Sequence, residues 1–204
     1  MLRLVDVRKR FGKVTAVDGL SLSVRPGEVM GLLGPNGAGK TTTIGMAVGL
    51  LRPDSGSVTL GEVDAGGLAG NPADARVRRL VGVAPQEIAL YNAMTARENL
   101  VLFGRLHGLG RQEARARAAE LLERIGLSDR AHHTVHGFSG GMKRRLNLAC
   151  ALVAEPRLVL LDEPTAGVDP QSRNAIFEIV ASLKASGVTV LFSTHYMEEA
   201  ARLC

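Results

Sequence analysis

The stretch Gly34-Pro35-Asn36-Gly37-Ala38-Gly39-Lys40-Thr41 decides the fold of this chain. It follows an apolar run, residues 29–33, and opens into a helix-forming segment, so a predicted strand leads through a glycine loop into a predicted helix with the spacing GxxxxGK[ST]. The glycines let the backbone turn tightly, so that successive N–H groups and the positive end of the helix dipole point at one anion. Lys40 supplies a positive charge for the β- and γ-phosphates, and the Thr41 hydroxyl is placed to bind Mg²⁺. A glycine-rich turn without a ligand is the alternative, and the complete motif favours a nucleoside triphosphate site.

The composition is that of an ordinary globular protein. The 204 residues are 46% hydrophobic and 22% charged, with a formal net charge of +5. We expect neither a membrane span nor a secretory signal, because no long uncharged apolar run occurs. The two distant cysteines, Cys150 and Cys204, indicate a reducing compartment. Basic residues cluster at 76–79, 111–117 and 143–145, but aromatic residues make up only 3%, which favours a solvated or partner-facing surface over a nucleic-acid surface.

Apolar patterns predict an α/β fold. Alternation over residues 1–24, broken by a turn at Gly12-Lys13, is typical of antiparallel strands, whereas the largely apolar runs 80–84, 158–161 and 188–192 indicate buried parallel strands. Residues 95–106 and 111–125 are predicted helices, the first beginning with a capping box at Thr95 and Glu98.

Polar side chains follow the predicted buried strands. Asp162 and Glu163 end one strand, and paired acids at that position suit one metal-binding and one water-polarising role. Gln86 follows another strand, either as a simple loop residue or as a group that reaches the metal or the attacking water. His195 ends a third strand beside the acidic one, which favours a catalytic over a structural role. His132, His133 and His136 lack partners at ligand spacing and are interpreted as surface histidines.

Two further features are ambiguous on their own. Ser139 is a good N-cap before Gly140 and Gly141, which makes either an ordinary capped helix or a second anion-binding helix terminus. Phe11, just before the first turn, is either a core residue or a platform for an adenine ring.

Taken together, these segments resemble the nucleotide-binding domain of an ABC transporter over essentially the whole chain. Three motifs in fixed order carry the resemblance: the phosphate loop that ends at Thr41, the run 138–142 (Phe-Ser-Gly-Gly-Met), similar to the family's signature loop, and the Asp162-Glu163 strand end. The implied fold is α/β: a P-loop NTPase core with a mostly parallel sheet, an N-terminal antiparallel β subdomain and an inserted α-helical signature subdomain over about residues 87–155, all in one domain, 1–204.

The resemblance also implies a role for each matching residue. Phe11 stacks on adenine, Glu163, His195, Lys40 and Gln86 are catalytic, Mg²⁺ is held by Thr41, Gln86 and Asp162, and Asp169 lies in a dimer interface. The remaining ATP-binding residues are Gly34, Pro35, Asn36, Gly37, Ala38, Gly39, Lys40, Thr41, Thr42, Ser139, Gly140 and Gly141.

At the level of assembly, the resemblance implies a head-to-tail homodimer that binds ATP and Mg²⁺ between its copies. A transmembrane permease subunit is the implied partner, with the chain peripheral on the cytoplasmic face of the cell membrane and no nucleic acid expected. The signature loop departs from the family at Phe138 and Met142, where Leu and Gln are usual, and Met142 cannot donate a strong hydrogen bond. This variant, with residues 90–100, looks like the branch that serves ABC-2-type exporters of drugs, lipids or polysaccharides. Family domains usually run on beyond the switch histidine, so we expect this chain to be truncated at its C-terminus.

Two other functions remain open at this point. A soluble ABC ATPase acting on nucleic acid or ribosomes is disfavoured because the long coiled coils or second domain of such proteins are absent. A nucleotide-gated binding module without turnover is disfavoured because Glu163 and His195 are both present.

Overall fold

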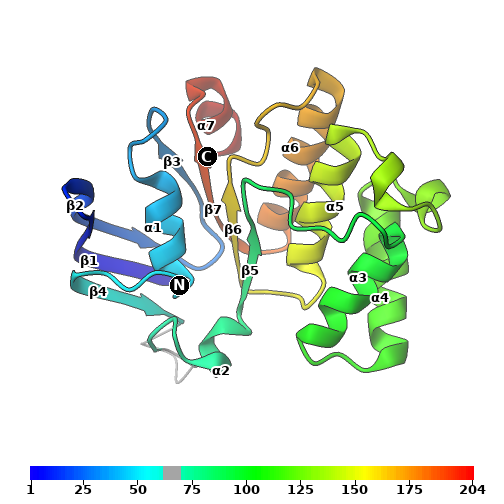
Figure 1. The fold of residues 1–204 in the computed structure, drawn as a ribbon, viewed down its shortest axis with the longest axis horizontal. Helices are drawn as coiled ribbons and strands as arrows, with labels where there is room; N and C mark the ends of the chain where they lie inside the picture. The colour runs from blue at the N-terminus through cyan, green and yellow to red at the C-terminus, as the bar shows by residue number, and fades with distance from the viewer. Residues whose placement is uncertain (62–69) are drawn as a thin grey trace.

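Within residues 1–61 and 70–204, which the computed structural model describes, the strands form two sheets (Figure 1). The antiparallel sheet has the order β2-β1-β4, and the parallel sheet has the order β3-β7-β6-β5. The strands are β1 (Leu2–Phe11), β2 (Val14–Val24), β3 (Val29–Leu33), β4 (Ser55–Leu60), β5 (Val81–Ala84), β6 (Leu158–Asp162) and β7 (Thr189–Thr194). The helices are α1 (Lys40–Ala47), α2 (Ala75–Arg78), α3 (Ala96–Leu106), α4 (Arg111–Arg124), α5 (Gly140–Leu152), α6 (Pro170–Ala185) and α7 (Met197–Leu203).

The parallel sheet is covered on both faces, which explains its continuous apolar strands. Every residue of β6 is buried. Leu158 and Leu160 pack in one hydrophobic cluster with Ile44 of α1, and Val159 and Leu161 pack in the other, which includes residues of α5 and α6. The sheet therefore lies between α1 on one side and α5 with α6 on the other (Figure 1).

The helical region is built as its sequence predicts. The capping box at the start of α3 is confirmed, because the Glu98 N–H donates to the Thr95 hydroxyl and the Glu98 carboxylate accepts the Thr95 N–H at 2.8 Å. In Figure 1, α3 and α4 stand at the end of the molecule opposite the antiparallel sheet, with α5 between them and the parallel sheet. No helix in the described residues is long and apolar enough to cross a membrane.

Gly82 in β5 gives a test of this packing. A Cβ atom at position 82 would lie 2.0 Å from the Ala151 carbonyl oxygen at the end of α5 and 2.9 Å from Cγ of Pro156. We expect Gly82→Ala to lower the free energy of unfolding by about 1 to 3 kcal/mol, because backbone has to move to admit the methyl group. Gly137→Ala is the matched control, since nothing lies within 4 Å of its added Cβ. Urea unfolding followed by circular dichroism measures both, and equal stability would contradict this packing.

Candidate nucleotide-binding and catalytic site

The glycine loop leaves β3 and enters α1 against the N-terminal sheet. Gly37 and Gly39 adopt φ angles of 81° and 84°, which side-chain-bearing residues rarely adopt. A Cβ on Gly39 would also lie 2.2 Å from the carbonyl oxygen of Ala16 in β2. Glycine at position 39 is therefore required both by its backbone conformation and by the closeness of β2.

Lys40, the first residue of α1, is only 6% exposed and is surrounded by oxygen atoms. Its Nζ donates to the carbonyl oxygens of Gly34 at 2.8 Å and Pro35 at 3.0 Å, and lies 3.1 Å from Oε1 of Glu163. These three oxygens match the three donors of an ammonium group. A triphosphate bound in the loop would compete with them for the lysine.

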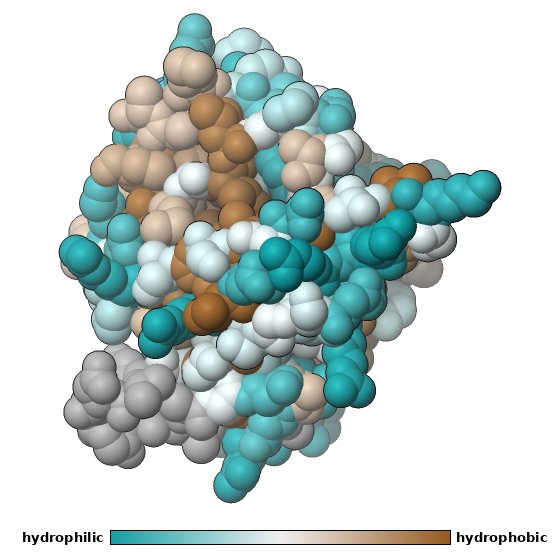
Figure 2. All heavy atoms as spheres, turned by 90° about the vertical axis from the view of Figure 1, so that its left-hand side faces the viewer, coloured by the Kyte–Doolittle hydropathy of each residue, from teal (hydrophilic) through white to brown (hydrophobic). Residues whose placement is uncertain are grey.

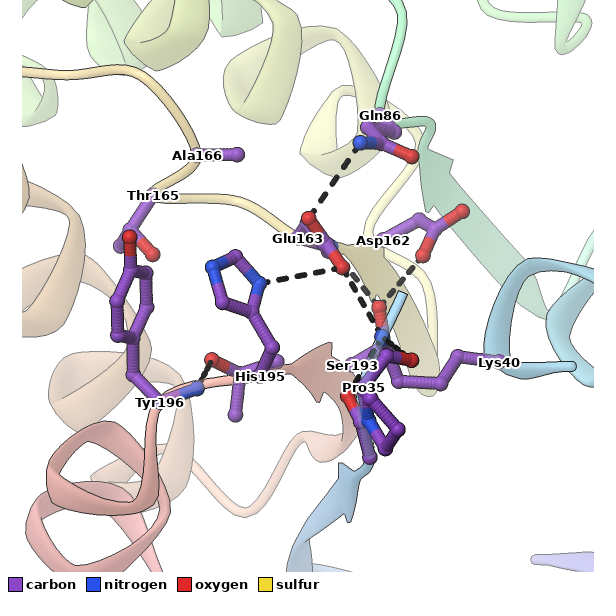
Figure 3. Close-up of polar contacts among 12 residues, drawn as sticks. Pro35, Lys40, Gln86, Asp162, Glu163, Thr165, Ala166, Ser193, His195 and Tyr196 are labelled. Atoms are coloured by element: carbon purple, nitrogen blue, oxygen red, sulfur yellow. Dashed lines mark hydrogen bonds and ion pairs between the residues drawn. The ribbon is translucent and has the colours of Figure 1, made fainter. Parts of the chain in front are cut away.

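Glu163 is where the predicted catalytic residues meet (Figure 3). Its Oε1 atom lies 3.1 Å from Lys40 Nζ and 3.4 Å from His195 Nδ1, and its Oε2 atom accepts a hydrogen bond from Gln86 Nε2 at 3.4 Å. His195 Nδ1 is buried and, within the described residues, has no hydrogen-bond partner, so the 3.4 Å to Glu163 is a close approach without a hydrogen bond. Lys40, Gln86, Glu163 and His195 thus come together at one edge of the parallel sheet, as their positions after parallel strands would require.

Ser193 holds the two carboxylates in place, a role that the sequence alone did not indicate. Its hydroxyl donates to Asp162 Oδ1 at 2.5 Å and accepts the backbone N–H of Glu163 at 3.0 Å. Glu163 has a φ angle of 47°, in the left-handed region that favours glycine, so this hydrogen bond stabilises a strained turn. Ser193 is opposite Asp162 in the pairing of β7 with β6. A polar residue at the end of an otherwise apolar strand was the available signal.

The signature loop packs on the start of α6. Ser139 caps α5 by accepting the N–H of Met142 at 3.2 Å. A Cβ on Gly141 would lie 1.9 Å from Oγ of Ser172 and 3.1 Å from Oδ2 of Asp169. Asp169 in turn caps α6, and its hydrogen bonds with Ser172 hold the pKa of the aspartate below its usual value. The structure thus brings the signature loop and the predicted interface residue together, in a group separate from the predicted catalytic residues around Glu163.

Phe138 and Met142, the two departures from the usual signature, belong to the core. Phe138 is buried, and Met142 packs against the same hydrophobic cluster. Gly140, between them, has nothing within 4 Å of an added Cβ and is exposed. The loop therefore anchors itself through apolar side chains and leaves Gly140 open.

Phe11 is exposed, so the interpretation of this residue as a core side chain is wrong. It lies at the end of β1, is 48% exposed and has Lys9 Nζ 5.7 Å from its ring centroid. The hairpin that carries it also contacts the glycine loop, through Ala16 and Gly39. Its role as an adenine platform stays a prediction.

Arg144 belongs to the basic cluster 143–145, interpreted as a solvated or partner-facing surface, but its side chain is only partly exposed and binds backbone of its own chain. Its guanidinium donates to the carbonyl oxygens of Gln86 at 2.6 Å, Pro85 at 3.4 Å and Ala166 at 3.3 Å. Burial lowers the pKa of Arg144, and the nearby carboxylates of Asp162 and Glu163 oppose that shift. Arg144 therefore joins the segments that follow β5 and β6, and no local sequence pattern indicated that.

Known proteins are similar to this chain in sequence and in fold. The sequence profile of the family described as "ABC transporter" matches residues 17–166. The chain is 50% identical over 204 residues to the linearmycin resistance ATP-binding protein LnrL of Bacillus subtilis (strain 168), covering 100% of this chain and 64% of that protein. It is 50% identical over 202 residues to the Nod factor export ATP-binding protein I of Burkholderia orbicola (strain AU 1054), covering 98% of this chain and 64% of that protein. The ATP-binding cassette MJ0796, in a dimeric post-hydrolysis state bound to ADP and Pi, matches with a TM-score of 0.85 and 29% identity over 99% of this chain and 91% of that chain.

The chain belongs to the ABC transporter family. The predicted family and the predicted α/β P-loop NTPase fold are confirmed, and the chain is an ATP-binding domain of the ABC ATPase class. It spans less than two thirds of the length of the curated relatives that it matches.

The residues of this ABC domain that would hold Mg²⁺ form a suitable donor set. The Thr41 hydroxyl, the Gln86 amide and the Asp162 carboxylate all supply oxygen atoms, the ligands that Mg²⁺ prefers. Thr41 lies in the first turn of α1, which follows β3, Asp162 is the last residue of β6, and Gln86 comes two residues after β5, so all three belong to the carboxyl-end edge of the sheet. Magnesium binding by these residues stays a prediction.

Ser193→Ala tests how the carboxylates are held. We expect the free energy of unfolding to fall by about 1 to 3 kcal/mol, because the buried Glu163 N–H loses its partner. We also expect kcat for ATP hydrolysis to fall by up to about a hundredfold, because Asp162 and Glu163 lose their common anchor. Ser186→Ala, which removes an exposed hydroxyl at the end of α6, should leave kcat unchanged. A parental kcat for Ser193→Ala, measured by phosphate release, would show that the hydroxyl has no positioning role.

Proposed function

We propose that this chain is the ATP-hydrolysing subunit of an ABC exporter. It works as a head-to-tail homodimer, peripheral on the cytoplasmic face of the membrane and attached to a separate membrane-spanning subunit. The observation that carries this proposal is the meeting of Lys40, Gln86 and His195 around Glu163. The names of the relatives LnrL and Nod factor export protein I, which refer to resistance and export, support transport out of the cell.

The contacts around Glu163 support a direct chemical role for each group. The Glu163 carboxylate orients or deprotonates the attacking water, and the His195 imidazole stabilises the charge that develops on the γ-phosphate. Thr41, Gln86 and Asp162 would hold Mg²⁺, which would supply positive charge to offset that of the triphosphate. Because Lys40 pairs with Glu163, a triphosphate that draws Lys40 to its own oxygens also releases the carboxylate that acts as the base.

The open side of the signature loop supports the dimer. Gly141 faces Ser172 and Asp169 of its own chain, whereas Gly140 faces outward. Ser139, Gly140 and the α5 N-terminus therefore have room to receive a phosphate held by the Lys40 of a second copy. The dimeric state of the neighbour MJ0796 is in line with this arrangement.

An apolar area beside α3 supports attachment to a membrane subunit. Ile88, Tyr91 and Leu106 are large hydrophobic side chains that remain exposed. A cleft of about 150 Å³ is lined in part by Ala89, Phe103 and His107, of which Ala89 and His107 are the chain neighbours of Ile88 and Leu106. Exposed apolar groups around a cleft are typical of a protein-binding surface.

Glu163→Gln tests the chemistry. We expect ATP binding to persist, because the amide keeps the size and polarity of the side chain, and kcat to fall about a hundredfold or more because the general base is lost. With ATP and Mg²⁺, the variant should accumulate as a dimer, measured by light scattering after size-exclusion chromatography. Normal turnover by Glu163→Gln would show that Glu163 is not the catalytic base.

Lys40→Ala tests the buried ion pair as well as the phosphate contact. Nucleotide binding should weaken strongly, and the free energy of unfolding should fall by about 3 kcal/mol because Glu163 is left as an unpaired buried charge. The double variant Lys40→Ala/Glu163→Gln should recover part of this stability without recovering nucleotide binding. Calorimetric titration with ATP and thermal unfolding separate the two effects. An unchanged ATP affinity for Lys40→Ala would contradict the assignment of the loop.

The partner is tested by recovering the tagged chain from detergent-solubilised native membranes with ATP. A polytopic membrane protein in stoichiometric amount is the expected result. Recovery with ribosomes or DNA in the soluble fraction would instead favour a soluble ABC ATPase, for which salt-sensitive nucleic-acid binding is the diagnostic property.

A further inference from the structure

Glu199 is a buried acid outside the group of residues assigned to the reaction. It lies in α7 and is only 4% exposed. Its Oε1 accepts a hydrogen bond from Thr165 Oγ1 at 2.6 Å, and its Oε2 accepts one from Thr194 Oγ1 at 2.6 Å. Each carboxylate oxygen thus has its own hydroxyl donor, as a buried acid requires.

The hydroxyl of Thr194 makes two hydrogen bonds. Its oxygen accepts the backbone N–H of Tyr196 at 3.0 Å, and its single proton goes to Glu199. A glutamine at position 199 has only one acceptor oxygen, so it can accept from only one of the two hydroxyls. Glu199→Gln therefore removes one of the two hydrogen bonds that the carboxylate accepts.

The two threonines belong to different functional segments. Thr165 lies in the segment that runs from Glu163 to Asp169, and Thr194 immediately precedes His195. Arg173, near the start of α6, places Nε 3.9 Å from Oε1 of Glu199. One carboxylate therefore contacts both ends of the segment 165–173 and the strand end that carries His195. In Figure 3, Thr165 and Tyr196 flank His195 on the side opposite Lys40.

We propose that Glu199 is a positioning residue that links the segment leading to the dimer interface with the segment that places His195 against Glu163. The inference rests on the proposed function, since it assigns Glu199 to the same reaction. When a second copy displaces residues 166–169, the displacement reaches His195 through Thr165, Glu199 and Thr194. Formation of the dimer is then coupled to the position of His195 relative to Glu163.

Glu199→Gln tests this link, and Glu198→Gln is the matched control because Glu198 is the preceding, exposed acid on the same helix. We expect kcat of Glu199→Gln to fall between about tenfold and a hundredfold. KM for ATP should stay within about twofold, because no contact of Glu199 with the glycine loop is involved. Thr165→Val should lower kcat similarly, and its combination with Glu199→Gln should be far from additive, since both changes remove the same link.

A second readout does not require hydrolysis. The ¹H–¹³C signal of the His195 imidazole, assigned by its loss in His195→Gln, should shift in Glu199→Gln and stay in place in Glu198→Gln. If the parent chain proves unable to hydrolyse ATP, the proposed function fails, while this spectrum still decides whether Glu199 positions His195.

A variant that only melts earlier, with kcat and the His195 signal unchanged, would make Glu199 a structural residue and overturn the proposal. If Glu199→Gln does not fold, Thr165→Val carries the test, because it removes one hydroxyl and keeps the side-chain volume. Parental kcat and an unmoved His195 signal in Thr165→Val would then overturn it.

Discussion

The buried ion pair of Lys40 and Glu163 connects the two halves of the site. Burying either charge alone would cost several kcal/mol, so each depends on the other and on the hydrogen bonds around them. Lys40 follows β3 and Glu163 follows β6, and β7 lies between those strands in the sheet. The pair forms because all three strands are parallel and end at the same edge. The order β3-β7-β6-β5 thus places Lys40, His195, Glu163 and Gln86 in sequence along one edge.

How much the sequence predicts depends on the range of the interactions. The glycine loop and the Asp162-Glu163 pair could be recognised because each motif carries its chemistry within a few neighbouring residues. Ser193 binds Asp162 and Glu163 across two strands, so its partners depend on the register of β7 with β6. Arg144 binds loop carbonyl groups from a helix, so its partners depend on which carbonyl groups are left without a partner in the folded chain. The exposure of Phe11 likewise depends on where the hairpin lies, which local alternation does not determine.

The two glycines of the signature loop show how structure separates residues that look equivalent in sequence. Contacts within one chain explain why position 141 is a glycine, because Ser172 and Asp169 leave no room for a Cβ atom. Gly140 is exposed and, among the residues that the structure describes, has no such neighbour that would require glycine there. Exposed apolar groups also occur away from α3. Figure 2, which shows the left-hand side of Figure 1, has an apolar area among polar side chains.

The segments that follow the parallel strands have left the sheet and its ladder of hydrogen bonds, so other groups must hold them. Arg144 binds the carbonyls after β5 and β6, the Ser193 hydroxyl binds the turn at Glu163, and the Thr194 carbonyl accepts the N–H of Gly34. These contacts join the segments to one another as well as to the core. A nucleotide that draws Lys40 away from Glu163 therefore acts on a connected set of loops, and the loop that carries Asp169 belongs to that set. This connection gives a physical route by which binding at the glycine loop can reach the proposed dimer interface.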